Sequence, residues 1–210
     1  MRAFLGRQAL RLGGWTIGNG PPDVKKFVLI AAPHTSNWDL IWLLAFAWTF
    51  EIEVSWLGKH TLFKPPLGWI LRPLGGVAVD RRAPGGVVGQ MTKIFAESER
   101  LIIVVPPEGT RRYRDHWKSG FFRIAEAADV PIVCGYLDYS IPKGGMNKAI
   151  DPKIGMDAVM DEVRAFYSSM EGKHPKEFGR PYLDGESKPP IEWRNEPASD
   201  TADRGSNKTK

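Results

Sequence analysis

The chain has 210 residues, of which 42% are hydrophobic and 25% charged, so it can bury one sizeable core and is not a disordered polymer. Lys and Arg number 29 against 24 Asp and Glu, and this basic excess favours anionic partners such as phosphates, lipid surfaces or nucleic acid. Cys134 is the only cysteine, which excludes a disulfide framework and a cysteine-ligated metal site and fits a reducing, cytoplasmic compartment.

The first 20 residues form an amphipathic segment. Four apolar side chains fall on one side of a helix, flanked by two arginines: Phe4, Leu5, Leu12 and Trp15, with Arg7 and Arg11. Two interpretations remain open, a helix lying in the membrane interface and a helix packed on the domain with its arginines in water. No run reaches the roughly 18–20 apolar residues that span a bilayer, and the segment lacks the pattern of a secretory signal. We therefore expect any membrane contact to be peripheral.

Apolar runs and helical periodicities then alternate along the chain. Strands are predicted at 27–31, 54–58, 76–80, 101–105 and 131–139, and helices at 38–50, 67–74, 87–98, 121–128 and 157–170. This alternation predicts an α/β fold with a largely parallel central sheet flanked by helices, preceded by a short N-terminal amphipathic helix. We divide the chain into the amphipathic segment 1–20, a domain at 21–185 and a polar tail at 186–210 that is expected to be disordered.

The loop after the first long strand carries the first chemical signal. His34 is followed by Asp39 at the start of a predicted helix, and the two can meet only if the chain turns between them. A carboxylate on one imidazole nitrogen fixes the tautomer and leaves the other nitrogen free as a base. Ser36 and Asp39 also fit a helix-capping pattern, which is an alternative explanation for the acid.

A second loop follows the predicted strand 101–105 in the same way. Glu108, Gly109, Thr110 and Arg111 supply an acid, a backbone that can approach a ligand closely, a hydroxyl and a bidentate phosphate ligand. The alternative is a surface turn with a local Glu–Arg pair. Basic residues continue to Arg123, a pattern that suits an anionic headgroup and equally a solvated face.

Four blocks occur in a fixed order along residues 25–140. They are His34-x-x-x-x-Asp39, then residues 76–81 ending in Asp80-Arg81, then Pro107-Glu108-Gly109-Thr110-Arg111, then Val130-Pro131-Ile132. The chain in this respect resembles the glycerolipid acyltransferase family, the group that contains the 1-acylglycerol-3-phosphate acyltransferases.

The resemblance implies a role for each block. His34 is expected to be the general base and Asp39 to orient it, while Arg81 and Arg111 would hold the acceptor phosphate. Glu108, Gly109 and Thr110 would complete the acceptor site, and residues 130–132 would line the acyl side. No metal or redox cofactor is expected, because the acyl donor would be a thioester of coenzyme A or an acyl carrier protein.

The expected function is transfer of a fatty acyl group to the hydroxyl of a lysophospholipid such as 1-acylglycerol-3-phosphate. The expected location is cytoplasmic, at the cytosolic face of a membrane, with no nucleic acid as partner. Two alternatives stay open: another lipid acceptor such as a lyso-ornithine lipid or glycolipid, and a non-catalytic module that binds anionic lipid or nucleic acid. A serine hydrolase is disfavoured because the chain has no Gly-x-Ser-x-Gly motif.

Overall fold

The computed structural model describes residues 1–79 and 85–187. Its strands are β1 (Thr16–Ile17), β2 (Lys26–Ala31), β3 (Ser55–Lys59), β4 (Gly76–Val79), β5 (Leu101–Val105), β6 (Ile132–Asp138) and β7 (Lys143–Ile150). Its α-helices are α1 (Arg2–Leu12), α2 (Trp38–Thr49), α3 (Leu67–Leu71), α4 (Gly86–Glu97), α5 (Gly120–Ala128) and α6 (Met156–Tyr167). Short 3-10 turns occupy His60–Phe63, Pro152–Ile154 and Pro175–Glu177. The predicted tail lies outside the described residues from 188 onward.

The strands form one sheet in the order β1-β7-β6-β2-β5-β3-β4. Strands β6, β2, β5, β3 and β4 run parallel, β7 runs antiparallel to β6, and β1 pairs in parallel with β7. The predicted α/β fold with a largely parallel sheet flanked by helices is confirmed. Strands β1 and β7 were not predicted, because β1 is very short and β7 begins with Lys143, Gly144 and Gly145 instead of an apolar run.

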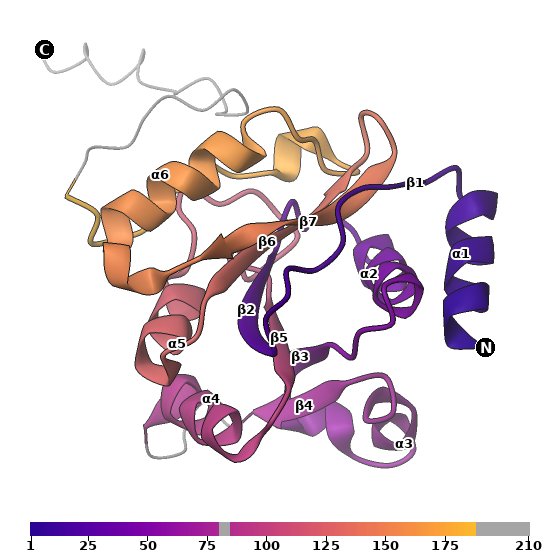
Figure 1. The fold of residues 1–210 in the computed structure, drawn as a ribbon, viewed down its shortest axis with the longest axis horizontal. Coiled ribbons are helices and arrows are strands. Elements are labelled where there is room, and N and C mark those ends of the chain that lie inside the picture. The colour runs from indigo at the N-terminus through magenta and orange to yellow at the C-terminus, as the bar shows by residue number, and fades with distance from the viewer. Residues whose placement is uncertain (80–84, 188–210) are drawn as a thin grey trace, which may run out of the picture.

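Helices cover both faces of the sheet (Figure 1), with α4, α5 and α6 on one face and α2, then α1, on the other. Alternation along β2 explains the two cores: Val28 and Ile30 belong to the core under α4, α5 and α6, while Phe27 and Leu29 belong to the core under α2. Both sets of side chains are fully buried, as expected of a central strand in a parallel sheet.

Helix α1 packs on α2 and completes the second face. It is buried through Gly6 and Leu10, and a Cβ placed on Gly6 would lie 2.6 Å from the carbonyl oxygen of Ala45 in α2. The glycine therefore permits the two helices to approach closely. Phe4, Leu5 and Leu12 stay exposed, so α1 packs on the domain and still presents an apolar surface to the outside.

The chain turns after α1, so Trp15 is not on the helix. Its ring is buried against Trp42 and Phe46 of α2. Among the described residues, no helix combines the length and the apolar character that crossing a bilayer requires.

Candidate active site

Three loops meet at the carboxyl edge of the parallel sheet. Strand β2 lies between β6 and β5, and the three strands end at Ala31, Asp138 and Val105. Because parallel neighbours end at the same edge, the residues that follow them are brought together there, which is where sites form in open α/β sheets. These residues are His34 after β2, Glu108 after β5 and Tyr139 after β6.

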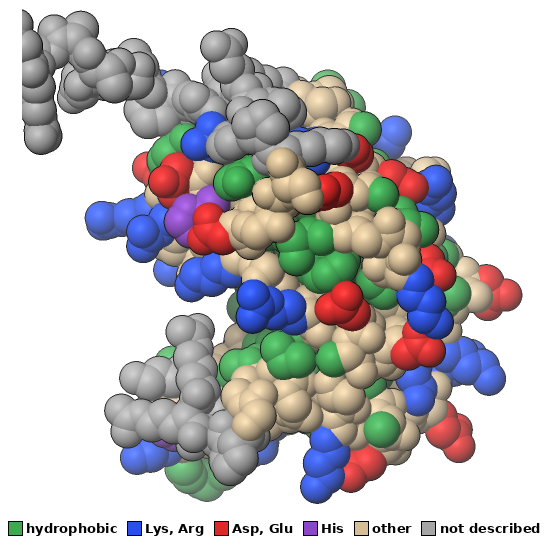
Figure 2. All heavy atoms as spheres, turned by 90° about the vertical axis from the view of Figure 1, so that its left-hand side faces the viewer, with side chains coloured by type: hydrophobic (Ala, Val, Ile, Leu, Met, Phe, Trp, Pro, Cys, Tyr) green, Lys and Arg blue, Asp and Glu red, His purple; other side chains and the backbone are tan. Residues whose placement is uncertain are grey.

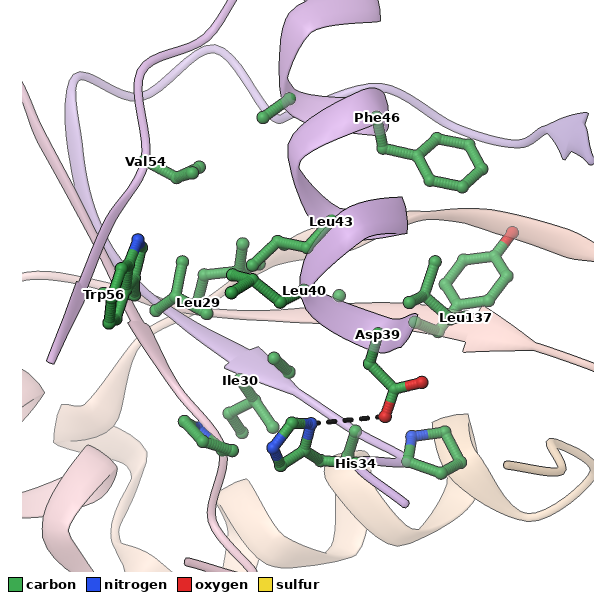
Figure 3. Close-up of a pocket in the computed structure, with 18 of the residues that line it drawn as sticks. Leu29, Ile30, His34, Asp39, Leu40, Leu43, Phe46, Val54, Trp56 and Leu137 are labelled. Carbon is green, nitrogen blue, oxygen red and sulfur yellow. Dashed lines mark ion pairs between the residues drawn. The ribbon is translucent and has the colours of Figure 1, made fainter. Parts of the chain in front are cut away.

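The predicted pair His34 and Asp39 is in contact. Nδ1 of His34 lies 3.2 Å from Oδ2 of Asp39, and Figure 3 shows the other ring nitrogen directed away from the carboxylate. Asp39 is buried in the first turn of α2. The carboxylate therefore fixes one imidazole nitrogen as donor and leaves the other available to accept a proton.

The alternative explanation of Asp39 as a capping residue also holds. Its Oδ2 accepts hydrogen bonds from the backbone N–H groups of Thr35 and Ser36, each at 2.9 Å. These bonds bend the loop back over the start of α2, and the bend brings His34 to the carboxylate. One side chain thus both shapes the loop and orients the imidazole, so the two interpretations do not compete.

Tyr139 contacts the other oxygen of the same carboxylate, although no sequence motif singles it out. Its hydroxyl donates a 2.7 Å hydrogen bond to Oδ1 of Asp39. Burial, and then the contact with Asp39, raise the pKa of the Tyr139 hydroxyl, which keeps it protonated as a donor. The ring packs edge-on against Trp15 at 5.0 Å between centroids. Its position at the end of the predicted strand 131–139 would have marked it only once β6 was known to lie beside β2.

Glu108 contacts the loop that carries His34 and is only 2% exposed. Its carboxylate accepts from the backbone N–H of His34, at 2.9 Å to Oε2 and 3.3 Å to Oε1. Burial raises its pKa well above the ordinary value. This is not the surface turn with a Glu–Arg pair that was the alternative. The geometry makes Glu108 a positioning residue for His34, while its predicted contact with the acceptor stays a prediction.

The remaining predicted residues divide between the site and its surroundings. Gly109 has φ +65 and lies beneath the side chain of Lys118, where a Cβ would meet Nζ at 2.8 Å. Thr110 accepts a weak hydrogen bond from the Arg112 backbone at 3.4 Å. Arg111 reaches the site itself, because it lines the same cavity as His34 and Asp39. Arg81 lies outside the described residues.

An apolar cavity of about 300 Å³ extends from His34 between α2 and the sheet. Figure 3 shows His34 and Asp39 at one end of it, with Leu40 and Leu43 from α2 facing Leu29 and Trp56 from the sheet. Phe46 also lines the cavity but points to the other side of α2, where Leu137 lies. His34 and Asp39 lie together at one end of the apolar lining, so the cavity can hold an aliphatic chain with its functional group beside the imidazole.

Strand β6 contributes to this cavity in a different place from the one predicted. Gly135, Tyr136 and Leu137 line it, near the carboxyl end of the strand. Val130 and Ile132 are buried in the core beneath α4, α5 and α6, at the amino end of β6 and away from His34. The fourth block therefore supports the sheet, and the expectation that residues 130–132 line the acyl side is wrong.

The described residues offer no grouping for a metal ion, since no three of their His, Cys, Asp or Glu side chains come together. Cys134 is buried in β6, and burial raises the pKa of its thiol to about 12. The chemistry that this geometry can perform is proton transfer by an oriented imidazole next to an apolar pocket with a cation at its mouth.

Comparisons with known proteins identify the family of this chain. A search of curated proteins found no match. The crystal structure of the 1-acyl-sn-glycerophosphate (LPA) acyltransferase PlsC from Thermotoga maritima is similar in fold, with a TM-score of 0.53 and 21% identity over 79% of this chain and 73% of that chain. The acyltransferase family model matches residues 18–137, which include His34, Asp39 and the loop at 108–111. The chain therefore belongs to the acyltransferase family.

Proposed function

We propose that this protein transfers a fatty acyl group from acyl-coenzyme A or an acyl carrier protein to the hydroxyl of a lysophospholipid, such as 1-acylglycerol-3-phosphate. The observation that carries the proposal is the position of the His34–Asp39 pair at one end of an apolar cavity. An aliphatic chain in that cavity has its reactive end beside the imidazole. The similar Thermotoga maritima protein is named for this activity, which adds support.

The reaction follows from the geometry of His34. The free ring nitrogen removes the proton of the acceptor hydroxyl as the oxygen attacks the thioester carbonyl, forming a tetrahedral intermediate. The C–S bond then breaks, and the thiolate takes the proton back from the imidazolium. Asp39 stabilises the imidazolium between the two steps. The thioester is already activated, so the proposed reaction uses no metal or redox cofactor.

Arg111 supports a phosphate-bearing acceptor. It lines the cavity next to His34, and a guanidinium binds phosphate through two parallel hydrogen bonds. Arg81 is proposed as a second ligand of the same phosphate on the strength of the resemblance alone.

We also propose that the protein works peripherally at the cytosolic face of a membrane, where both its lipid substrate and its product reside. Helix α1 exposes Phe4, Leu5 and Leu12 beside Arg7 and Arg11, a combination suited to the interface of an anionic membrane. Further exposed apolar side chains occur near the start of α2 and on α3: Trp38, Ile41, Leu67, Trp69 and Ile70.

The decisive experiment measures turnover of His34→Ala with acyl-coenzyme A and 1-acylglycerol-3-phosphate. Loss of a general base is expected to reduce turnover by roughly 10²–10⁴-fold. His60→Ala, which alters an exposed histidine in a 3-10 turn, serves as matched control and should retain the parent rate. Parent-like turnover by a folded His34→Ala protein would show that the base is misassigned, and no turnover by the parent with any lysolipid would refute the proposed reaction.

A further inference from the structure

A second cavity, of about 560 Å³, opens beside the loop that carries His34 and shares Arg111 with the apolar cavity. It is lined by residues from the loop after β2, the loop after β5 and the segment after α6: Thr35, Arg111, Arg112, Lys173, His174, Pro175, Lys176 and Glu177. We propose that this basic groove binds the phosphate of the acceptor, with Lys173 and Lys176 as ligands in addition to Arg111. The inference rests on the proposed function and assigns residues outside the segment that matches the family.

The charge of the groove suits a phosphate dianion. Arg111, Arg112, Lys173 and Lys176 bring four permanent cations to it. Within residues 1–79 and 85–187, Arg111, Arg112 and Lys176 form no ion pair with a carboxylate, so their charges are not neutralised there. Figure 2 shows Lys, Arg and His side chains along the left edge of one face, above a notch in the outline, with acidic side chains among them.

The single acid in the groove is already engaged. Oε2 of Glu177 accepts a 2.6 Å hydrogen bond from the backbone N–H of Tyr113. This bond fixes the segment at 173–177 against the loop that follows Arg111 and Arg112. The Glu177 carboxylate thus joins the segment at 173–177 to the loop that carries Arg111 and Arg112. The groove keeps an excess of positive charge.

The groove begins one residue from the general base. Thr35 directly follows His34, and its Oγ1 accepts a 3.1 Å hydrogen bond from the backbone N–H of His174. Lys173 also lies close to the start of α2, because its Nζ is 5.1 Å from the centre of the Trp38 ring. Arg111 lines both cavities and so connects the groove to the apolar pocket.

This closeness identifies which substrate phosphate fits. In a glycerol phosphate acceptor, the phosphate is separated from the reacting hydroxyl by only a few bonds, so it must lie next to His34. In a coenzyme A or carrier-protein thioester, the whole pantetheine arm separates the thioester from the nearest phosphate. A cationic groove that starts at Thr35 is therefore placed for the acceptor phosphate and not for the donor phosphates.

The test compares Lys173→Gln, Lys176→Gln and the double variant with the parent, and Lys93→Gln on α4 is the matched control. Lys93 is an exposed lysine whose ion pair with Glu97 lies on another part of the surface. For the double variant, we expect the KM for a short-chain 1-acylglycerol-3-phosphate to rise by about tenfold, as for the loss of charge-assisted contacts. The KM for acyl-coenzyme A should stay within about twofold of the parent value, because the proposed contact is with the acceptor. A rise in the donor KM instead, or no change in either constant, would overturn the inference and leave the proposed function intact.

A binding measurement keeps the inference testable without turnover. Calorimetric titration of the full chain with glycerol 3-phosphate should show binding that is lost in the double variant and retained in Lys93→Gln. Glycerol should show none. If the parent binds glycerol 3-phosphate in this way but transfers no acyl group, the groove stands and the proposed reaction falls. Equal binding by the parent and the double variant would refute the groove.

Discussion

Asp39 satisfies four donors with two oxygens, and the shared carboxylate holds the loop residue His34 in one orientation. Oδ2 accepts from two backbone amides and faces the ring of His34, while Oδ1 accepts from the Tyr139 hydroxyl. Each of these bonds is charge-assisted and is worth about 1.5–3 kcal/mol when the partner is buried. The orientation of the base therefore depends on the whole set of donors and not on the pair alone.

Tyr139→Phe removes one of the four donors to Asp39, the Tyr139 hydroxyl. Removing the hydroxyl leaves Oδ1 without its donor, so we expect kcat/KM to fall by about tenfold, equivalent to ~1.4 kcal/mol. The variant keeps the ring and its packing against Trp15, so a loss of rate reports the missing hydrogen bond. A parent-like kcat/KM would show that Tyr139 contributes packing only.

Glu108 predicts a pH dependence of stability. Because burial raises the pKa of its carboxyl in the folded protein, the folded state holds the proton more tightly than the unfolded state does. Its contribution to stability is complete below the ordinary carboxyl pKa and is lost as pH rises through the folded pKa. Glu108→Gln keeps an acceptor for the His34 N–H but cannot ionise.

Urea denaturation of the parent and of Glu108→Gln across a pH series measures this effect. The difference in the free energy of unfolding should shift in favour of the variant as pH rises above the ordinary carboxyl range. A difference that stays constant with pH would show that Glu108 does not titrate between the two states as its burial predicts.

Helix α1 has two surfaces with different tasks. Gly6 and Leu10 face α2, whereas Phe4, Leu5 and Leu12 are 64%, 49% and 87% exposed. The exposed side chains contribute little to the folded domain, but each can gain up to about 1.5–3 kcal/mol on full burial in a lipid interface. The helix is therefore suited to bind a membrane while remaining packed on the domain.

Vesicle sedimentation checks this property of α1. The triple variant Phe4→Ser, Leu5→Ser, Leu12→Ser should bind vesicles containing anionic phospholipid at least about tenfold more weakly than the parent. Ile154→Ser removes an apolar side chain of similar exposure from a 3-10 turn after β7 and should bind like the parent. Equal binding by the triple variant would exclude α1 as the membrane contact, and circular dichroism confirms that each variant is folded.

At the scale of the whole molecule, the sequence predicted those parts that depend on local pattern. Strands β2 and β5 are continuous apolar runs, and His34 and Asp39 are close in the chain, so both the central sheet and the contact between His34 and Asp39 could be predicted from the sequence. Strand β7 could not be predicted in this way, because its residues owe their extended form to pairing with β6. Tyr139 reaches Asp39 only through the order of the strands, and Lys173 reaches the second cavity only through the path of the chain after α6. No short motif encodes either arrangement.

Helix α2 both lines the apolar cavity and carries Asp39. Helix α2 supplies Leu40, Leu43, Phe46 and Phe50 to the cavity wall and carries Asp39 in its first turn. An outward shift of α2 that admitted a longer chain would also move Asp39 away from His34 and, in the proposed mechanism, lower the activity. A change of preferred chain length at constant rate must therefore come from replacing bulky side chains of α2 in the cavity wall by small ones, without any movement of the helix.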